Sequence, residues 1–171
     1  APLTGLVVGE RPDHELPSGW AEVTVKAASL NHHDLWSLRG VGLGTDKLPM
    51  ILGCDAAGVD GDGNEVIVHA IVGDPAWSGD ETLDPRRSIL SERYQGTFAD
   101  RVVVPKANLI AKPAGMSFEE AACLPTAWLT AYRMLFVQGN LKPGETVLVQ
   151  GAGGGVATAL ITLARAGGLK V

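Results

Sequence analysis

The stretch Thr146-Val-Leu-Val-Gln-Gly-Ala-Gly-Gly-Gly-Val-Ala157 decides the fold. Its first five residues are a short apolar run, rich in Val, of the kind buried on both faces of a parallel sheet. The glycines of Gly151–Gly155 form a turn, and residues 156–166 have the composition of a helix that two further glycines end. Residues 169–171 would open the next strand. This order predicts one βα unit of a parallel α/β sheet.

The glycine turn suits a dinucleotide. A pyrophosphate needs backbone N–H groups and a helix N-terminus at close range, and residues without Cβ let the main chain approach it. The spacing fits either Gly151-x-Gly153 with Val156 as third member, or Gly151-x-x-Gly154-x-x-Ala157. A flexible connection is the alternative, but a position between strand and helix favours dinucleotide binding. The predicted cofactor-binding residues of the turn are Gly151, Gly153, Gly154, Gly155, Val156 and Ala157.

Residues 1–112 are predicted to be β-rich, because short apolar runs alternate with Gly, Pro and Asp clusters. In Ala21–Ala28 apolar and polar residues alternate as in a half-buried strand. Further strands are expected at residues 6–8, 51–59, 65–72, 98–104 and 109–111, with a turn over residues 61–64. We expect a barrel or sandwich.

From residue 113 the pattern becomes helical. Ser117-Phe-Glu-Glu120 is a capping box, and apolar residues recur at helical spacing from Pro125 until Gly139. The predicted domains are therefore residues 1–112 and 113–171. One βα unit cannot bury its own apolar faces, so the nucleotide-binding domain is expected to be incomplete.

The composition excludes several classes of protein. The 171 residues are 46% hydrophobic, and 14 Lys and Arg against 19 Asp and Glu give a net charge of −5, with no basic stripe for nucleic acid. Cys54 and Cys123 are too few for a disulfide framework, which favours a reducing cytoplasm. Neither a secretory signal nor a membrane span is expected, because the longest uncharged run, Thr146–Ala164, contains polar and glycine residues.

Four further motifs precede the glycine turn: Ser29-Leu-Asn-His-His-Asp34, Leu52-Gly-Cys-Asp-Ala-Ala-Gly58, Tyr94-Gln-Gly-Thr-Phe-Ala99 and Ala121-Ala-Cys-Leu-Pro-Thr-Ala-Trp-Leu-Thr-Ala-Tyr132. In this order they resemble the medium-chain dehydrogenase/reductase superfamily, in its zinc-independent quinone oxidoreductase-like branch. The resemblance implies a chaperonin-10-like, partly open β-barrel followed by the beginning of a Rossmann domain. Against the family pattern the chain looks truncated at both ends.

The resemblance also bears on zinc. Asn31, Cys54 and Thr126 stand where zinc members of the family carry their catalytic ligands, and no cysteine-rich lobe for structural zinc is present. Asn and Thr are poor zinc ligands. The residues His32, His33, Cys54, Asp55 and His69 would supply donors for an improvised site, but we expect no metal.

Catalytic roles follow from the same resemblance. Without zinc a hydrogen-bond donor must polarise the substrate and a proton must be delivered, so Asn31 and His33 are the predicted catalytic residues; imidazole exchanges protons near neutral pH. His32 is expected near the pyrophosphate. The alternative is that Asn31 caps a short helix whose two histidines face solvent. Asp34 is expected to be a buried hydrogen-bond acceptor.

Thr126 and Thr130 lie one helical turn apart and are expected beside the nicotinamide, unless Thr126 caps its helix. The family implies NADP(H) rather than NAD(H), a small-molecule substrate and a homodimer. The predicted function is a zinc-independent, nicotinamide-dependent oxidoreductase that transfers hydride to an activated C=C, quinone or carbonyl. The alternatives are a zinc-dependent alcohol dehydrogenase with a nonstandard metal site and a non-catalytic dinucleotide-binding module.

Overall fold

A computed structural model describes residues 2–13 and 15–171. The chain divides after Ala122 into two compact units, and each is described by itself. The boundary expected after residue 112 therefore lies ten residues before the division in the structure. The reason is a helix that packs on the sheet of the first unit.

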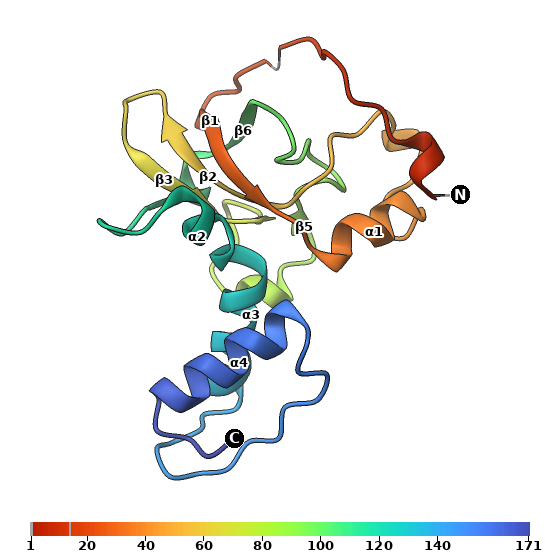
Figure 1. Ribbon diagram of the computed structural model, residues 1–171. Coiled ribbons are helices and arrows are strands. Elements are labelled where there is room, and N and C mark those ends of the chain that lie inside the picture. Colours follow the sequence, from red (N-terminus) through yellow and green to blue (C-terminus); the bar gives the residue numbers. More distant parts are fainter. Residues whose placement is uncertain (1, 14) are drawn as a thin grey trace. The chain divides into compact units, whose positions relative to one another are not determined.

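The first unit is built on a curled five-stranded sheet (Figure 1). Its strand order is β6-β1-β2-β3-β7, and every neighbouring pair is antiparallel. The β-rich, partly open barrel predicted from the sequence is confirmed. The strands are β1 (Trp20–Ser29), β2 (Asp55–Asp60), β3 (Glu65–Val68), β6 (Arg101–Pro105) and β7 (Leu109–Ala111), with β4 (Ile71–Val72) and β5 (Ser88–Ile89) in a second sheet.

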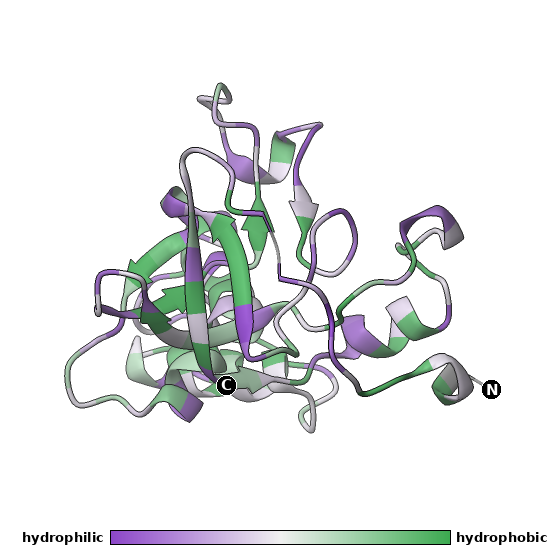
Figure 2. Cartoon of the chain, turned by 90° about the horizontal axis from the view of Figure 1, so that it is seen from above, coloured by the Kyte–Doolittle hydropathy of each residue, from purple (hydrophilic) through white to green (hydrophobic). Residues whose placement is uncertain are grey.

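The sheet core comes from alternating strand residues. Val66 and Val68 of β3 and Val102 and Val104 of β6 are buried in one cluster with Cys54. Figure 2 shows the apolar residues of these strands in green. Trp20 and Tyr94 pack against the same cluster, with their ring centroids 5.3 Å apart, so Tyr94 is a packing residue as expected.

Several strand predictions need correction. The strand expected at 65–72 is divided into β3 and β4, which lie in different sheets, and the strand expected at 98–104 begins only at Arg101. No strand forms over residues 6–8, where Val7 and Val8 are 85% and 97% exposed. A strand needs a neighbour for its backbone groups, and none of the described strands pairs with this segment. The strand expected at 51–59 begins only at Asp55, because Gly53 has a positive φ of 91° and residues before it bond outside the sheet.

The first unit also contains a hairpin turn and several short helices. The predicted hairpin turn over residues 61–64 is present, with the Asp60 N–H donating to the Asn64 carbonyl at 3.0 Å. The helices are η1 (Pro2–Gly5), α1 (His32–Leu38), η2 (Thr45–Lys47), η3 (Glu81–Leu83), η4 (Lys106–Asn108) and α2 (Phe118–Ala122).

The helix α2 packs on β1, β2 and β3, which places it with the sheet. Its capping box is present: the Glu120 N–H donates to Ser117 Oγ at 3.2 Å, and the Ser117 N–H donates to Glu120 Oε2 at 3.0 Å. The ammonium of Lys112 lies before it, 2.9 Å from Glu65 Oε2 and 5.2 Å from the Phe118 ring centroid. These contacts fasten the segment after β7 to the sheet.

The second unit is helical. A continuous run comprises η5 (Leu124–Trp128), α3 (Leu129–Tyr132) and η6 (Arg133–Gln138), and it ends at Gly139 as predicted. The helix α4 (Gly155–Ala166) packs beside α3 (Figure 1). Among the described residues, no helix is long and apolar enough to cross a membrane.

The strand expected over residues 146–150 is not formed as an element. It makes one parallel bridge, between Thr146 and Lys170, and Leu148 is 84% exposed. Burial on both faces was therefore the wrong expectation for this chain. The physical reason is that, among the described residues, the pairing of residues 146–150 is confined to this one bridge, which is too short to make a ladder.

Candidate functional site

One candidate site, in the first unit, is the junction of β1 and α1. Asn31 has extended backbone angles and precedes the first helical residue, so it is the N-cap of α1. Asp34 Oδ2 accepts a hydrogen bond from the Asn31 N–H at 2.7 Å, and Asp34 is 4% exposed. The prediction of Asp34 as a buried acceptor is confirmed. It fixes the direction in which α1 leaves the sheet.

The side chain of Asn31 connects this junction to β2. Its Nδ2 donates to Asp55 Oδ2 at 2.9 Å and to Cys54 Sγ at 3.6 Å. Ser29 Oγ donates to the same carboxylate oxygen at 3.1 Å. Cys54 and Asp55 are fully buried. Asn31 therefore caps α1, as the alternative to a catalytic role proposed, and it also bridges the buried side chains of Cys54 and Asp55.

The segment that contains Gly96 and Thr97 bonds to residues 51–55 and holds Cys54 and Asp55 in place. The Gly96 N–H donates to the Ile51 carbonyl at 2.8 Å, and Thr97 Oγ1 donates to the Asp55 carbonyl at 3.0 Å. A Cβ on Gly96 would lie 2.3–2.6 Å from the backbone oxygens of residues 51–53. Only glycine lets the two segments approach so closely, which accounts for Gly96 in the Tyr94–Ala99 motif.

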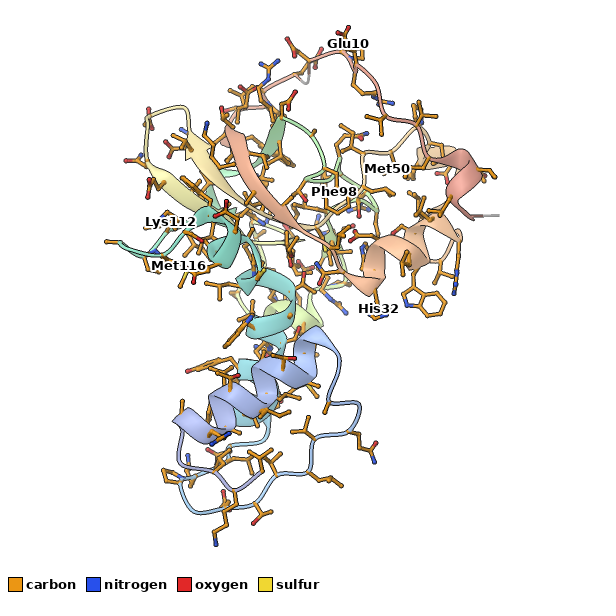
Figure 3. All side chains as sticks on the ribbon, viewed as in Figure 1. Glu10, His32, Met50, Phe98, Lys112 and Met116 are labelled. Carbon is orange, nitrogen blue, oxygen red and sulfur yellow. The ribbon has the colours of Figure 1, made fainter. Side chains whose placement is uncertain are left out.

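The two histidines of α1 lie in different environments. His32 is exposed, and Figure 3 shows it at the beginning of the helix. His33 is 20% exposed, and its Nε2 lies 3.1 Å from Glu92 Oε1. Its Nδ1 is buried and has no hydrogen-bond partner among the residues that the structure describes. The alternative with both histidines facing solvent is therefore wrong for His33. The pyrophosphate role of His32 stays a prediction.

Glu92 was missed by the sequence analysis. It is the last residue of a loop, residues 73–92, to which no role was assigned. Buried Asp84 organises this loop: its Oδ2 accepts from the Asp74 N–H at 2.6 Å and its Oδ1 from the Arg86 N–H at 2.7 Å. The loop brings Glu92 to a residue 59 positions earlier in the sequence. No local pattern signals a contact over that separation.

Two of the residues that stand at the zinc-ligand positions of the family, Asn31 and Cys54, contact each other. Asn31 presents N–H donors to Cys54 and Asp55, and a donor facing the sulfur opposes a cation there. A different grouping is present: His33, Asp34 and Cys54 each offer one ligand atom, all within 4.8 Å of one another. The improvised set did not contain Asp34. His69, which it did contain, bonds Glu81 at 2.9 Å instead.

Another candidate site, in the second unit, is the glycine turn before α4. Gly151 has a φ of +69°, and a Cβ on either Gly151 or Gly153 would meet nothing within 4 Å. Gly154 is the N-cap: its N–H donates to the Gly151 carbonyl at 3.2 Å, and its own carbonyl accepts from Thr158 at 2.9 Å. The turn is thus exposed and open on one side.

The first helical residues of α4 complete this turn. The N–H groups of Gly155, Val156 and Ala157 precede the first i to i−4 hydrogen bond, so the helix itself gives them no acceptor. Ala157 is 6% exposed, and a Cβ on Gly155 would lie 3.6 Å from the Ala127 Cβ. Small residues thus allow close packing beneath the turn, while the helix N-terminus faces outward.

The two predicted threonines lie in the run η5–α3. Thr126 is half-buried within η5, whose N-cap is Cys123, so Thr126 does not cap this helix. Thr130 is exposed on α3. Their placement beside a nicotinamide stays a prediction.

Comparisons with known proteins agree with the fold. The family "Alcohol dehydrogenase GroES-like domain" matches residues 17–114. The chain is 38% identical over 147 residues to the "Synaptic vesicle membrane protein VAT-1 homolog" of Mus musculus, and the match covers 86% of this chain and 33% of the relative.

Two solved structures extend the comparison. The quinone oxidoreductase from Thermus thermophilus, solved with NADPH, has a TM-score of 0.71 and 34% identity, covering 98% of this chain and 48% of that one. The cobalt- and zinc-bound alcohol dehydrogenase from Pyrobaculum aerophilum has a TM-score of 0.88 and 27% identity, covering 98% and 54%. The chain thus spans about half of these solved chains and a third of the curated relative.

Proposed function

The chain belongs to the medium-chain dehydrogenase/reductase superfamily, and from this premise we propose that it is a zinc-independent, nicotinamide-dependent oxidoreductase. It transfers hydride to an activated C=C, a quinone or a carbonyl of a small molecule. The observation that carries the proposal is the open glycine turn at the N-terminus of α4, because it offers backbone donors to an anion. The likeness to an NADPH-binding quinone oxidoreductase supports NADP(H) as the cofactor.

The turn residues and Ala157 hold the pyrophosphate, and Thr126 and Thr130 line the nicotinamide. His32 adds a cationic or donor contact to the phosphates. The cofactor, when bound, supplies the hydride, and the protein orients it and keeps water away. The enzyme is proposed to be a homodimer, as its resemblance to the family implies, and to be cytoplasmic, as its two cysteines favour.

Asn31 supports zinc independence. A substrate oxygen or an enone carbonyl must be polarised as hydride arrives, and an amide N–H does this where no metal is held. The two N–H groups of Asn31 are held by Asp55 and Cys54, and the longer bond, to the sulfur at 3.6 Å, is the one that a substrate oxygen would replace. His33, the second residue of α1, delivers the proton.

The grouping of His33, Asp34 and Cys54 favours one rival, a metal-dependent alcohol dehydrogenase with a nonstandard site. Elemental analysis of protein purified without chelator separates the two. We expect less than about a tenth of an equivalent of zinc per chain; one equivalent that survives gel filtration would replace the proposal with the rival.

Turnover is the second test. Purified protein is mixed with NADPH or NADH and a panel of quinones, enones and aldehydes, and the loss of reduced nicotinamide is followed by absorbance. Oxidation that requires both protein and acceptor supports the proposal. Saturable NADPH binding without oxidation across the panel would instead indicate the non-catalytic dinucleotide-binding module.

A further inference from the structure

We propose that Glu92 is a positioning residue that fixes the protonation geometry of His33, so that His33 exchanges its proton from Nδ1. The inference rests on the proposed reductase function and assigns a further residue to it. Glu92 lies outside every motif that identified the family, and it reaches His33 only through the fold.

The contact determines which ring nitrogen carries the proton. An ionised carboxylate accepts hydrogen bonds and donates none, so the His33 Nε2, 3.1 Å from Glu92 Oε1, must be the donor. Neutral His33 is therefore the Nε2–H tautomer with a lone pair on Nδ1. When His33 is charged, the additional proton is on Nδ1. The carboxylate thus has the role of the orienting acid in a carboxylate–histidine pair.

The surroundings of Nδ1 suit proton exchange. Nδ1 is buried, and no described residue bonds it. Asp34 Oδ1 is likewise buried without a hydrogen-bond partner among the described residues, and Cys54 belongs to the same group of side chains. Glu92, Asp34 and Cys54 are the titratable groups that face the ring. An imidazole nitrogen without a protein partner leaves its hydrogen bond available to a reacting group.

The backbone holds Glu92 in this position. Ser91 has a φ of +68°, is fully buried, and donates its N–H to the Tyr94 carbonyl at 2.9 Å. On the other side, a Cβ on Gly42 would lie 2.6 Å from Glu92 Oε1, and Gly42 has a φ of +79°. A left-handed serine therefore precedes Glu92, and Gly42 lies close to its carboxylate, which is 30% exposed. Such strained positions are retained where the surrounding structure requires them.

Reduced nicotinamide gives two electrons as hydride to one substrate atom and becomes oxidised nicotinamide. The imidazolium of His33 breaks its Nδ1–H bond and gives that proton to the second substrate atom, an oxygen or a carbon. The substrate has then gained two hydrogens, and neutral His33 recovers a proton from water. Glu92 keeps its charge throughout and compensates the imidazolium.

The experiment compares Glu92→Gln with Glu92→Asp in the full chain. Glutamine has the same size but lacks the charge and can donate as well as accept. Heteronuclear NMR of the ring nitrogens should show the Nε2–H tautomer of His33 in the wild type and a population of the Nδ1–H tautomer in Glu92→Gln. We expect kcat of Glu92→Gln to fall about tenfold to a hundredfold with KM for NADPH unchanged, and the alkaline limb of the kcat profile to move to lower pH. Glu92→Asp should restore part of kcat.

The chain contains a matched control. His69 and Glu81 form a second histidine–carboxylate pair, with Nε2 2.9 Å from Oε2, away from the proposed machinery. Glu81→Gln should change the NMR signals of His69 and leave kcat and its pH profile as in the wild type. Equal effects of the two variants on kcat would overturn the inference, because they would reflect general destabilisation.

The NMR result separates this inference from the proposed function. A wild-type His33 in the Nδ1–H tautomer, or a tautomer and pH profile that Glu92→Gln leaves unchanged, overturns the role of Glu92 even in an active reductase. If the wild type shows no reductase activity while the tautomer depends on Glu92, the positioning geometry stands and the proposed function fails.

Discussion

The amide nitrogen of Asn31 lies 3.6 Å from the Cys54 sulfur and donates to it, while the same nitrogen donates to Asp55 at 2.9 Å. A neutral donor thus joins two fully buried groups from the start of β2 to the cap of α1. This bridge sets the position of the next residues of α1, including His33.

Replacing Asn31 tests the bridge. Asn31→Ala should lower the free energy of unfolding by about 1–3 kcal/mol, because the buried Asp55 carboxylate loses a donor. Urea denaturation measures the change. Asn64→Ala is the control, since Asn64 bonds Asp60 at the protein surface. A loss for Asn31→Ala no larger than for Asn64→Ala would contradict the structural role of the bridge.

A side chain added in the glycine turn should lower the affinity for the cofactor without affecting folding. In Gly153→Val the new side chain meets no protein atom at its Cβ, so folding should be preserved while the branched group occupies the space of the pyrophosphate. We expect a rise of about tenfold or more in the Kd for NADPH, measured by fluorescence titration. Gly9 also has open space around a Cβ, and Gly9→Val should leave the Kd unchanged. Unaltered binding by Gly153→Val would remove this turn from the cofactor site.

Asp60 predicts a pH dependence of stability. Hydrogen bonds from the Asn64 side chain and from the Asn64 backbone hold the pKa of Asp60 below its ordinary value of 3.8. Since a depressed pKa means that folding favours the ionised form, the contribution is present above pH 3.8 and is lost as pH falls through the lower, folded pKa. Unfolding of wild type and Asp60→Asn should differ at about pH 6 and converge in acid. Asp62→Asn is the control, and its free energy of unfolding should not converge with that of the wild type in acid. If Asp60→Asn differed from the wild type by the same free energy at every pH, the ionised contact of Asp60 would be contradicted.

Replacing Lys112, which lies in the segment before α2, should lower the stability of the fold. Its side chain is 5% exposed and its ammonium bonds Glu65 and the Met116 carbonyl. Lys112→Met keeps the aliphatic stem but leaves these acceptors without their donor, so we expect a loss of about 1–3 kcal/mol in thermal or urea unfolding. Lys106→Met, at an exposed site, should change stability by less than about 0.5 kcal/mol. Equal losses would show that the contacts of Lys112 contribute little.

Local patterns predicted much of the fold. The capping box Ser117–Glu120 and the end of the helix at Gly139 need only a few neighbouring residues, and the structure has both. The strand expected at 146–150 failed because its formation depends on a partner strand, which periodicity does not describe. A short apolar run shows that a segment can form a strand, whereas the neighbouring strands determine whether a hydrogen-bonded ladder forms.

The candidate functional residues likewise include some that a local motif predicts and some that only the fold brings together. The cap at Asn31 and the glycine turn were visible because each is a local motif with a backbone purpose. The contact between His33 and Glu92 was not, because 59 positions separate the two residues and Glu92 ends a loop whose folding depends on buried Asp84. A pair of this kind becomes visible only when the fold brings its members together.

The hairpin of β4 and β5 has a practical consequence. Ile71 pairs with Ile89 and Val72 with Ser88, so the intervening residues leave and re-enter the fold at adjacent points. Gly96 then anchors the following chain against Ile51–Gly53, independently of what the hairpin encloses. A loop of another length can therefore be exchanged between β4 and β5 without shifting the register that holds Cys54 and Asp55, whereas the approach of Glu92 to His33 depends on keeping Asp84.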